Sequence, residues 1–315
     1  MDKMIVFSGN SNQNLASKIC KNLKLKMGGG LISRFSDGEV RIKIEENVRG
    51  KDVFIVQSTC APVNENIMEL LIMIDALKRA SANRITAVMP YFGYARQDRK
   101  DQPRVPITAK LIANLLTVAG ANRVLALDLH AGQIQGFFDI PVDHIFAIDV
   151  FVDYFKEIGV NNLVIVSPDV GGIKMARAYA KKFRAGLAIV DKRRNTPDAT
   201  EVMHILGEVE GKNVIIVDDI IATGSSLVEA AGAIRRAGAK KIFAAISHGI
   251  LSANAVEKLE SSDIDYLVIT DSIPLDEEKK SKKIKIVSVS KLFAEAIKRI
   301  HFEQSISVLF DSIRR

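Results

Sequence analysis

Short apolar runs alternate along the whole chain with longer stretches in which apolar residues recur at helical spacing. Most of the short runs are continuous and rich in β-branched residues, which is typical of strands that are covered on both faces. We therefore expect buried parallel strands, and the runs that predict them lie at residues 4–9, 53–58, 84–90, 123–129, 162–169, 187–191, 213–219, 241–249 and 266–272.

Amphipathic stretches separate the expected strands, and clear examples are residues 64–82, 106–120 and 225–239. Pro106 suits the first position of a helix, and the second and third stretches have an Ala-Gly pair near their ends that favours helix termination. Strands that alternate with helices in this way predict βαβ units, and therefore an α/β fold with parallel sheets.

The alternation runs through once and restarts near residue 148, which indicates two similar domains. We expect the first domain at residues 1–147 and the second at 148–300, with the tail 301–315 packing back on the first. Residues 274–286 form a run of charges, which predicts a solvent-exposed connection before the last strand.

Composition narrows the function classes. The 315 residues carry 44 Lys and Arg against 37 Asp and Glu, a formal net charge of +7, and this excess suits either nucleic acid or small polyphosphates. The basic residues are dispersed and Trp is absent, so we expect no nucleic-acid partner.

Cys20 and Cys60 lie far apart, as expected of buried free thiols. The longest apolar stretch is interrupted by Glu69 and Asp75, so we expect no membrane span. Without a signal-peptide pattern, the expected location is cytoplasmic.

Several expected strands end in polar side chains. Ligands of open α/β sheets bind beyond the carboxyl ends of the strands, so residues at these ends are candidates for a shared site. The candidates are Asp128, His130, Asp169, Lys192 to Arg194, Asp218 and Asp219. One such residue alone would be an ordinary cap or ion-pair partner, but four strand ends of one chemical kind favour a functional site.

The stretch "VIIVDDIIATGSS", residues 214–226, carries the clearest chemistry. Backbone amides of residues 222–226 at the start of a helix form an anion cradle, and the Thr and Ser hydroxyls add donors. The stretch lacks the GxxxxGK pattern of a Walker loop. Asp218 and Asp219 suit sugar hydroxyls, so the stretch predicts a ribose 5-phosphate site; the alternative is an ordinary capped helix.

This stretch resembles the ribose-phosphate loop of phosphoribosyltransferases and ribose-phosphate pyrophosphokinases. The rest of the chain resembles the phosphate-activated, ADP-inhibited class of ribose-phosphate pyrophosphokinases, through "RFSDGEVRIKIEENVRGKDVFIVQST", "YFGYARQDRK", "LDLHAGQIQGFFDIPVDH", "SPDVGG", "DKRR" and "SISVLF". The resemblance implies two phosphoribosyltransferase-like, Rossmann-like domains with parallel central sheets. It also implies ribose-phosphate diphosphokinase activity: the β,γ-diphosphoryl group of Mg-ATP passes to ribose 5-phosphate, giving phosphoribosyl diphosphate and AMP.

The resemblance assigns roles to residues of this sequence. It implies ATP binding by Phe35, Asp37, Gly38, Glu39, Arg96 and Gln97, Mg²⁺ contacts by His130 and Asp169, and catalysis by Lys192 and Arg194. It implies ribose 5-phosphate binding by Arg194, Asp218, Asp219, Ala222, Thr223, Gly224, Ser225 and Ser226. Without the resemblance, these segments would be interpreted as a hairpin, a charged loop, a structural histidine and a solvated strand end.

The resemblance also implies self-association. The "RFSDGE" turn is expected to reach the neighbouring subunit's site within dimers that assemble into a homohexamer. Inorganic phosphate and ADP are expected as effectors, bound near Arg49, Ser305 and Ser307. The chain departs from the family at Ala222, where an acid is usual, and we expect this change to affect catalytic rate.

Two rival interpretations share this fold. A phosphoribosyltransferase would consume phosphoribosyl diphosphate, but it would have no use for the "RQDRK" and "DLHAGQ" segments that the ATP site explains. A non-catalytic regulatory paralogue would be expected to lose the basic loop, whereas Lys192, Arg193 and Arg194 are all present.

Overall fold

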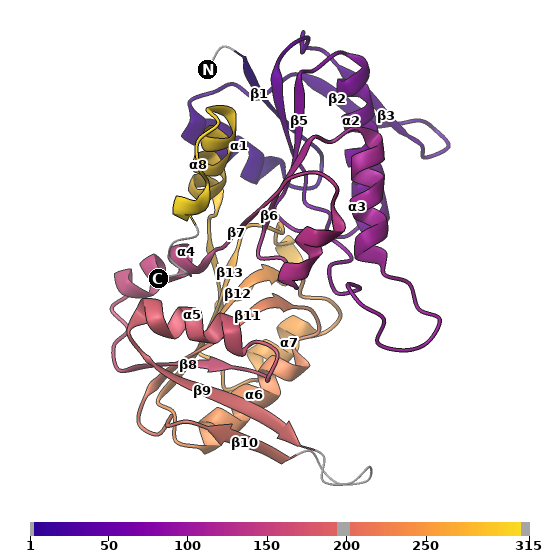
Figure 1. Cartoon of the computed structure of the whole chain (residues 1–315). Coiled ribbons are helices and arrows are strands. Elements are labelled where there is room, and N and C mark those ends of the chain that lie inside the picture. Colours follow the sequence, from indigo (N-terminus) through magenta and orange to yellow (C-terminus); the bar gives the residue numbers. More distant parts are fainter. Residues whose placement is uncertain (1–2, 194–201, 310–315) are drawn as a thin grey trace. The chain divides into compact units, whose positions relative to one another are not determined.

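A computed structural model describes residues 3–193 and 202–309 (Figure 1). The chain divides into two compact units. Among the described residues, the first contains those up to Phe146, the short segment Ser272–Pro274 and residues 288–309. The second contains Ala147–Asp271 and Leu275–Val287. Each unit is built around its own sheet.

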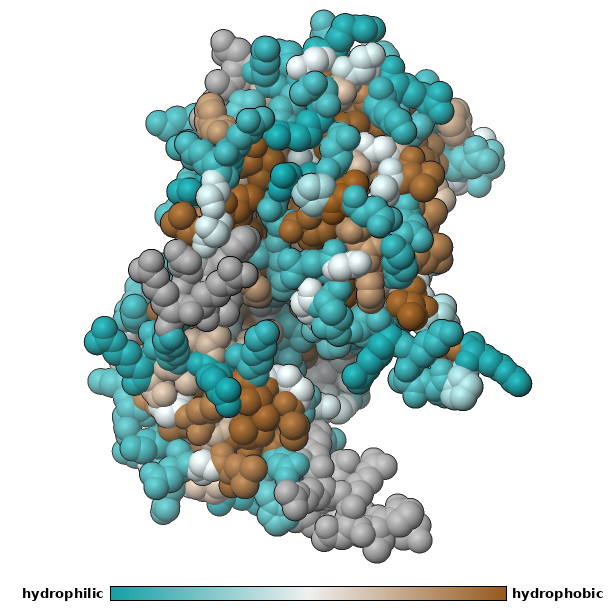
Figure 2. Space-filling view, viewed as in Figure 1, coloured by the Kyte–Doolittle hydropathy of each residue, from teal (hydrophilic) through white to brown (hydrophobic). Residues whose placement is uncertain are grey.

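Polar residues cover most of the visible surface of each unit, with apolar residues in separate patches (Figure 2). Among the residues that the structure describes, no helix is both long enough and apolar enough to cross a bilayer.

The first unit contains a five-stranded parallel sheet in the order β1-β4-β5-β6-β7. The strands are β1 (Met4–Ser8), β4 (Asp52–Val56), β5 (Arg84–Met89), β6 (Arg123–Leu127) and β7 (Val142–Ile145). All five residues of β4 are buried, as expected of a strand covered on both faces. The predicted runs at 4–9, 53–58, 84–90 and 123–129 are thus confirmed as strands.

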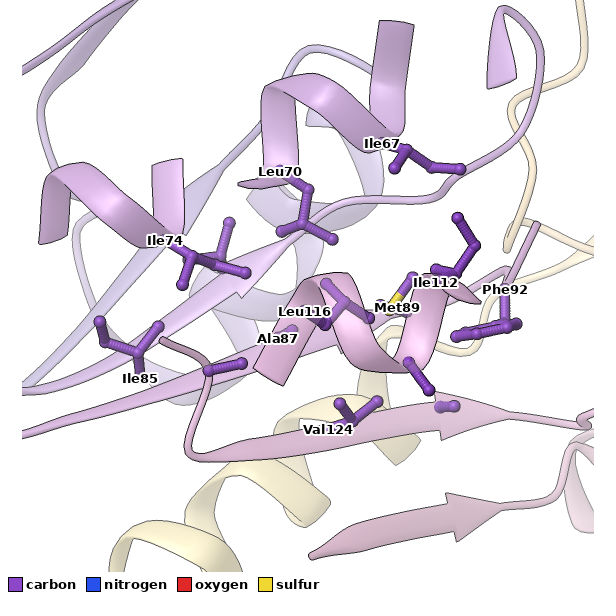
Figure 3. Packing of buried hydrophobic residues seen from close by; sticks show 14 of the residues in the cluster. Ile67, Leu70, Ile74, Ile85, Ala87, Met89, Phe92, Ile112, Leu116 and Val124 are labelled. Carbon is purple, nitrogen blue, oxygen red and sulfur yellow. The ribbon is translucent and has the colours of Figure 1, made fainter. Parts of the chain in front are cut away.

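Helices cover both faces of this sheet. Those of the first unit are α1 (Gln13–Leu23), α2 (Val63–Arg79), α3 (Thr108–Ala119) and α8 (Ser290–His301), with the short 3-10 helices η1 (Gly132–Phe137) and η3 (Ser307–Leu309). Figure 3 shows Leu70 and Ile74 of α2, with Leu116 of α3, directed toward Ala87 and Val124 of the sheet. The core therefore lies between the sheet and the apolar stripes that predicted the helices.

Helix α8 belongs to the first unit, although the sequence placed residues up to 300 in the second domain. Its apolar stripe, with Phe293 and Ile297 fully buried, packs beside α1 (Figure 1). Asn22 of α1 also donates a hydrogen bond to Ser290 Oγ at 3.1 Å. Periodicity identifies the apolar face of a helix but not the unit that covers it, which explains the error.

A two-stranded antiparallel hairpin, β2 (Gly30–Arg34) and β3 (Val40–Ile44), completes the first unit. Gly38 has a left-handed φ of 96°, and its N–H bonds to Phe35 O at 3.0 Å, which closes the turn. The "RFSDGE" segment therefore forms a turn, as predicted.

The second unit contains a seven-stranded sheet in the order β10-β9-β8-β11-β12-β13-β14. Only the β9–β10 pair is antiparallel in the described sheet. Its strands are β8 (Leu163–Ser167), β9 (Gly186–Arg193), β10 (Val202–Leu206), β11 (Asn213–Ile221), β12 (Lys241–Gly249), β13 (Tyr266–Thr270) and β14 (Ile284–Val287). The five strands predicted in this half of the chain are confirmed.

The helices of the second unit are α4 (Ile148–Glu157), α5 (Ile173–Phe183), α6 (Ser225–Arg236) and α7 (Ala255–Glu260), with the short 3-10 helix η2 (Glu277–Lys279). One core joins the sheet to α6 and α7 through residues such as Ala230, Ile234 and Leu259. On α4, Phe155 packs edge-on against Phe183 and Phe243, with ring centroids 6.1 and 5.7 Å away.

Candidate functional site

Two adjacent carboxylates lie near the end of β11. Asp219 is buried at 6% exposure, and its backbone N–H donates to Asp218 Oδ1 at 2.9 Å. Burial raises the pKa of Asp218 to about 8, helped by the negative charges of Asp219 and Asp169. The end of this strand therefore concentrates carboxylate oxygens that favour a proton, a cation or the hydroxyls of a ligand.

A loop follows this acidic pair and leads directly into α6. Gly224 has a left-handed φ of 74° and occupies the N-cap position, and the first backbone bond of α6 runs from Val228 N–H to Gly224 O at 3.0 Å. The amides of the first helical turn have no intrahelical acceptor, and no side chain of the described residues caps them. Thr223 and Ser226 are exposed beside them. The loop therefore presents the donors that the sequence predicted for an anion.

Asp169 follows β8, which is the neighbour of β11 in the sheet. Its Oδ1 accepts the Gly172 N–H at 2.9 Å, and its backbone oxygen accepts the Ser167 hydroxyl at 2.7 Å. These contacts fix the turn that leads into α5. Asp169 and the acidic pair thus lie at the carboxyl end of the same sheet, and the charge of Asp169 contributes to the raised pKa of Asp218.

The basic segment lies on the β9–β10 ribbon. Lys192 falls within β9 and pairs in register with Met203 of β10. Arg194 lies outside the described residues. The antiparallel pairing of β9 with β10 makes Lys192 part of a two-stranded ribbon at the edge of the sheet.

In the first unit, two of the expected ATP residues, Arg96 and Gln97, follow β5. The Gln97 N–H donates to Tyr94 O at 2.9 Å, and Gln97 Oε1 accepts the Thr108 hydroxyl at the start of α3. Arg96 is exposed. Asp98 accepts a hydrogen bond from Gln133 at 2.8 Å, which connects this loop to the segment that follows β6.

His130 is exposed just beyond β6, the neighbour of β5 in the sheet. The structure therefore brings the Arg96 loop and His130 to the carboxyl ends of adjacent strands. The backbone here is held by His144, because the Leu129 N–H donates to His144 Nε2 at 2.9 Å. Sequence reasoning did not assign a role to His144. This residue lies in the short edge strand β7, whose four residues give little pattern.

The hairpin turn exposes an aromatic ring. Phe35 is 49% exposed, and the Arg41 guanidinium lies 5.5 Å from its ring centroid. Asp37 Oδ1 accepts the Glu39 N–H at 3.2 Å, so one expected adenine-binding acid also stabilises the turn.

The three expected effector residues lie in two exposed segments of the first unit. The Arg49 N–H bonds to Asn47 Oδ1 at 3.1 Å, and the next residue, Gly50, donates to Ser81 O at 2.9 Å. The hydroxyls of Ser305 and Ser307 lie 2.6 Å apart. Within the part of the chain that the structure describes, no side-chain hydrogen bond or ion pair joins Arg49 to these serines.

Sequence reasoning also missed Lys258. This residue lies on α7 and donates to Ser225 Oγ at 2.7 Å, so it contacts the anion-binding loop directly. Within residues 3–193 and 202–309, no three His, Cys, Asp or Glu side chains are grouped as metal ligands would be.

Comparisons with known proteins agree along the chain. Residues 4–120 match the family described as the N-terminal domain of ribose phosphate pyrophosphokinase, and residues 193–311 match the phosphoribosyl synthetase-associated domain. The ribose-phosphate pyrophosphokinase of Fusobacterium nucleatum is 57% identical over 308 residues, covering 97% of this chain and 98% of the relative. That of Bacillus caldolyticus is 55% identical over 306 residues, covering 97% of each chain. The crystal structure of phosphoribosylpyrophosphate synthetase from Mycobacterium smegmatis superimposes with a TM-score of 0.90 at 39% identity, over 96% of this chain and 99% of that one.

Proposed function

The chain belongs to the family of ribose-phosphate pyrophosphokinases, and on that premise we propose that it transfers the β,γ-diphosphoryl group of ATP to the anomeric hydroxyl of ribose 5-phosphate. The anomeric oxygen bonds to the β-phosphorus, the bond from that phosphorus to the α–β bridging oxygen breaks, and AMP leaves with the bridging oxygen. The anomeric proton is released. The end-to-end match with pyrophosphokinases carries this proposal.

Ribose 5-phosphate would bind at the carboxyl end of β11. The 5-phosphate accepts hydrogen bonds from the amides and hydroxyls of residues 223–226, and the carboxylates of Asp218 and Asp219 accept from the ribose hydroxyls. Two observations support this placement: no side chain caps the start of α6, and the acidic pair directly precedes the loop. Ala222 helps to fix the loop, because its backbone carbonyl accepts the Ser252 N–H at 3.0 Å.

ATP would bind through the loop after β5 and the hairpin turn. Arg96 and Gln97 hold the triphosphate and ribose, Phe35 stacks on adenine, and Asp37 and Glu39, on either side of Gly38, accept from the exocyclic amine. The exposed ring of Phe35 supports this role, because a large aromatic side chain at 49% exposure gains stability when a flat ligand covers it.

Magnesium fits the oxygen donors near β8 and β11. Mg²⁺ usually binds through one or two carboxylates together with substrate phosphates, and Asp169 is an exposed carboxylate. The pKa of Asp218 is raised first by burial and then by the charges of Asp219 and Asp169, and a cation bound nearby would offset both effects. We expect Asp169 and His130 to contact the ion, which when bound neutralises phosphate charge.

Lys192 and Arg194 would act on the transferred group. Phosphoryl-type transfer passes through a loose transition state, so the protein mainly positions the reactants and stabilises charge on the migrating oxygens. Such a transition state depends little on early removal of the anomeric proton. The absence of a carboxylate at Ala222 is therefore compatible with activity at a reduced rate.

Assembly and regulation extend the same proposal. The chain would self-associate into dimers and a homohexamer, with the hairpin turn completing a neighbour's nucleotide site. Exposed apolar side chains on α2 and α3 support association: Met68 is 52% exposed, Leu111 53% and Val118 78%. Phosphate and ADP would bind as effectors near Arg49, Ser305 and Ser307. The enzyme would be cytoplasmic.

The test is synthesis of phosphoribosyl diphosphate and AMP from ribose 5-phosphate and Mg-ATP. We expect one AMP for each phosphoribosyl diphosphate, and we expect Lys192→Ala to lower kcat by about 100-fold or more with little change in the KM for ribose 5-phosphate. Lys181→Ala, an exposed lysine on α5, is the matched control and should retain activity. Consumption of phosphoribosyl diphosphate with a free base would indicate a transferase instead, and a folded but inactive wild type would indicate the regulatory paralogue.

A further inference from the structure

In the second unit, the start of helix α7 and the segment before it pack directly against the loop that joins β11 to α6. The Ser252 N–H donates to Ala222 O at 3.0 Å, and the Ile250 N–H to Ile221 O at 3.0 Å. A Cβ placed on Gly224 would lie 3.7 Å from the backbone oxygen of Ala255, the first residue of α7. The backbone at the start of α7 is therefore held close to this loop, and side chains of α7 lie within reach of it.

Lys258 is that side chain. Its ammonium donates to Ser225 Oγ at 2.7 Å, and among the residues that the structure describes it forms no ion pair. Ser225 is the first residue of α6, so the ammonium lies at the positive end of the helix dipole with only a neutral hydroxyl as its partner. A positive charge that faces the positive end of a helix dipole is unfavourable unless an anion lies between or beside them.

The direction of this hydrogen bond determines what Ser225 can do. An ammonium only donates, so Ser225 Oγ must be the acceptor. The hydroxyl proton of Ser225 is then free for another acceptor, and the neighbouring positive charge makes it a stronger donor. An acceptor that satisfies both Ser225 and the uncapped amides of α6 is a phosphate oxygen.

We propose that Lys258 is a further ribose 5-phosphate-binding residue, which orients the Ser225 hydroxyl toward the 5-phosphate and adds a positive charge beside the loop. This inference rests on the proposed function, because it takes residues 223–226 as the phosphate site. It assigns Lys258 to substrate affinity and not to the chemical step, since the transferred group comes from ATP.

The experiment compares Lys258→Met with Lys241→Met, measuring steady-state kinetics at saturating Mg-ATP. Lys241 is an exposed lysine at the opposite end of the sheet, where β12 begins, so the control removes the same charge far from the loop. We expect Lys258→Met to raise the KM for ribose 5-phosphate about tenfold, with kcat and the KM for ATP within about twofold of wild type. Lys241→Met should change none of the three, and Lys258→Arg should recover most of the affinity.

The double variant tests the route through Ser225. If Lys258 acts by orienting this hydroxyl, Ser225→Ala with Lys258→Met should raise the KM no more than Lys258→Met alone. Effects that multiply would overturn the inference, as would an unchanged KM or a fall confined to kcat in Lys258→Met. These failures leave the wild-type activity in place, whereas a wild type that makes no phosphoribosyl diphosphate overturns the proposed function and the inference together.

Discussion

Asp218 shows how one side chain couples the site to stability. Its pKa is raised to about 8, first by burial and then by the charges of Asp219 and Asp169, whereas an Asp in the unfolded chain titrates near about 4. The folded protein therefore holds a proton that the unfolded chain releases. The resulting stability is fully present below about pH 4 and is lost as the pH rises toward 8.

We predict that Asp218→Asn stabilises the ligand-free protein at high pH, because an amide cannot ionise. At pH 8 its free energy of unfolding should exceed that of wild type by at least about 2 kcal/mol, and the difference should vanish below about pH 4. Urea denaturation at several pH values, without Mg²⁺ or substrates, measures this. Asp153→Asn, which changes an exposed Asp on α4, should have no such pH dependence. A difference that stays constant with pH would refute the assignment.

At the scale of elements, the sequence predicted the buried strands and the edge strand β1, but it missed the edge strand β7. Continuous runs such as the one in β11 carry an unambiguous pattern, because both faces are covered. Edge strand β7 reads "VDHI", which alternates polar and apolar residues over only four positions and gives little signal. The predicted loop at the end of β11 was recognisable from local sequence. Lys258 was not, because its contact with Ser225 spans 33 residues along the chain.

Helix α8 is attached to the first sheet by a buried ionic cluster. Arg84 donates twice to Asp52, at 2.8 and 2.6 Å, and also to the Ile300 carbonyl at 2.9 Å. His301 Nδ1 lies 2.8 Å from Asp52 Oδ2. The carboxylate of Asp52 thus connects strands β4 and β5 to the end of α8. Asp52 is only 7% exposed, so water solvates this carboxylate poorly.

We predict that Asp52→Asn lowers the free energy of unfolding by about 3 kcal/mol, because the partly buried Arg84 loses its counter-charge. Asp75→Asn provides the contrast, since the Asp75–Arg79 pair lies on the exposed face of α2, with side-chain exposures of 48% and 79%. That change should leave the free energy of unfolding almost unchanged, because water screens an exposed ion pair. Equal losses in the two variants, measured by urea denaturation, would contradict this account.

At the scale of the whole molecule, the proposed assembly makes each nucleotide site depend on two subunits. Phe35 and the acids of its turn lie on a hairpin, whereas Lys192, for which we propose a catalytic role, lies on a separate ribbon of the second unit. If the hairpin serves a neighbour, a subunit damaged at the hairpin and a subunit damaged at Lys192 can form one intact site between them.

We predict such complementation in mixed assemblies. The variant Phe35→Ala/Asp37→Ala/Glu39→Ala and the variant Lys192→Ala should each be nearly inactive alone. Coexpressed in equal amounts, they should recover about one quarter of the wild-type specific activity, because half of random pairs are mixed and each mixed pair holds one intact site. Each variant coexpressed with itself serves as the control. No recovery in assemblies shown to contain both chains would place the hairpin in its own subunit's site.

The return of the chain to its first unit also affects the order in which the protein is completed on the ribosome. Domains commonly fold as they emerge, starting from the N-terminus. Here the first 146 residues emerge without α8, so the buried face of α1 that α8 covers has no partner during most of synthesis. The second unit has all of its strands once Val287 has emerged, before α8 has been made. The unit whose synthesis begins first is therefore the last to acquire its full set of helices.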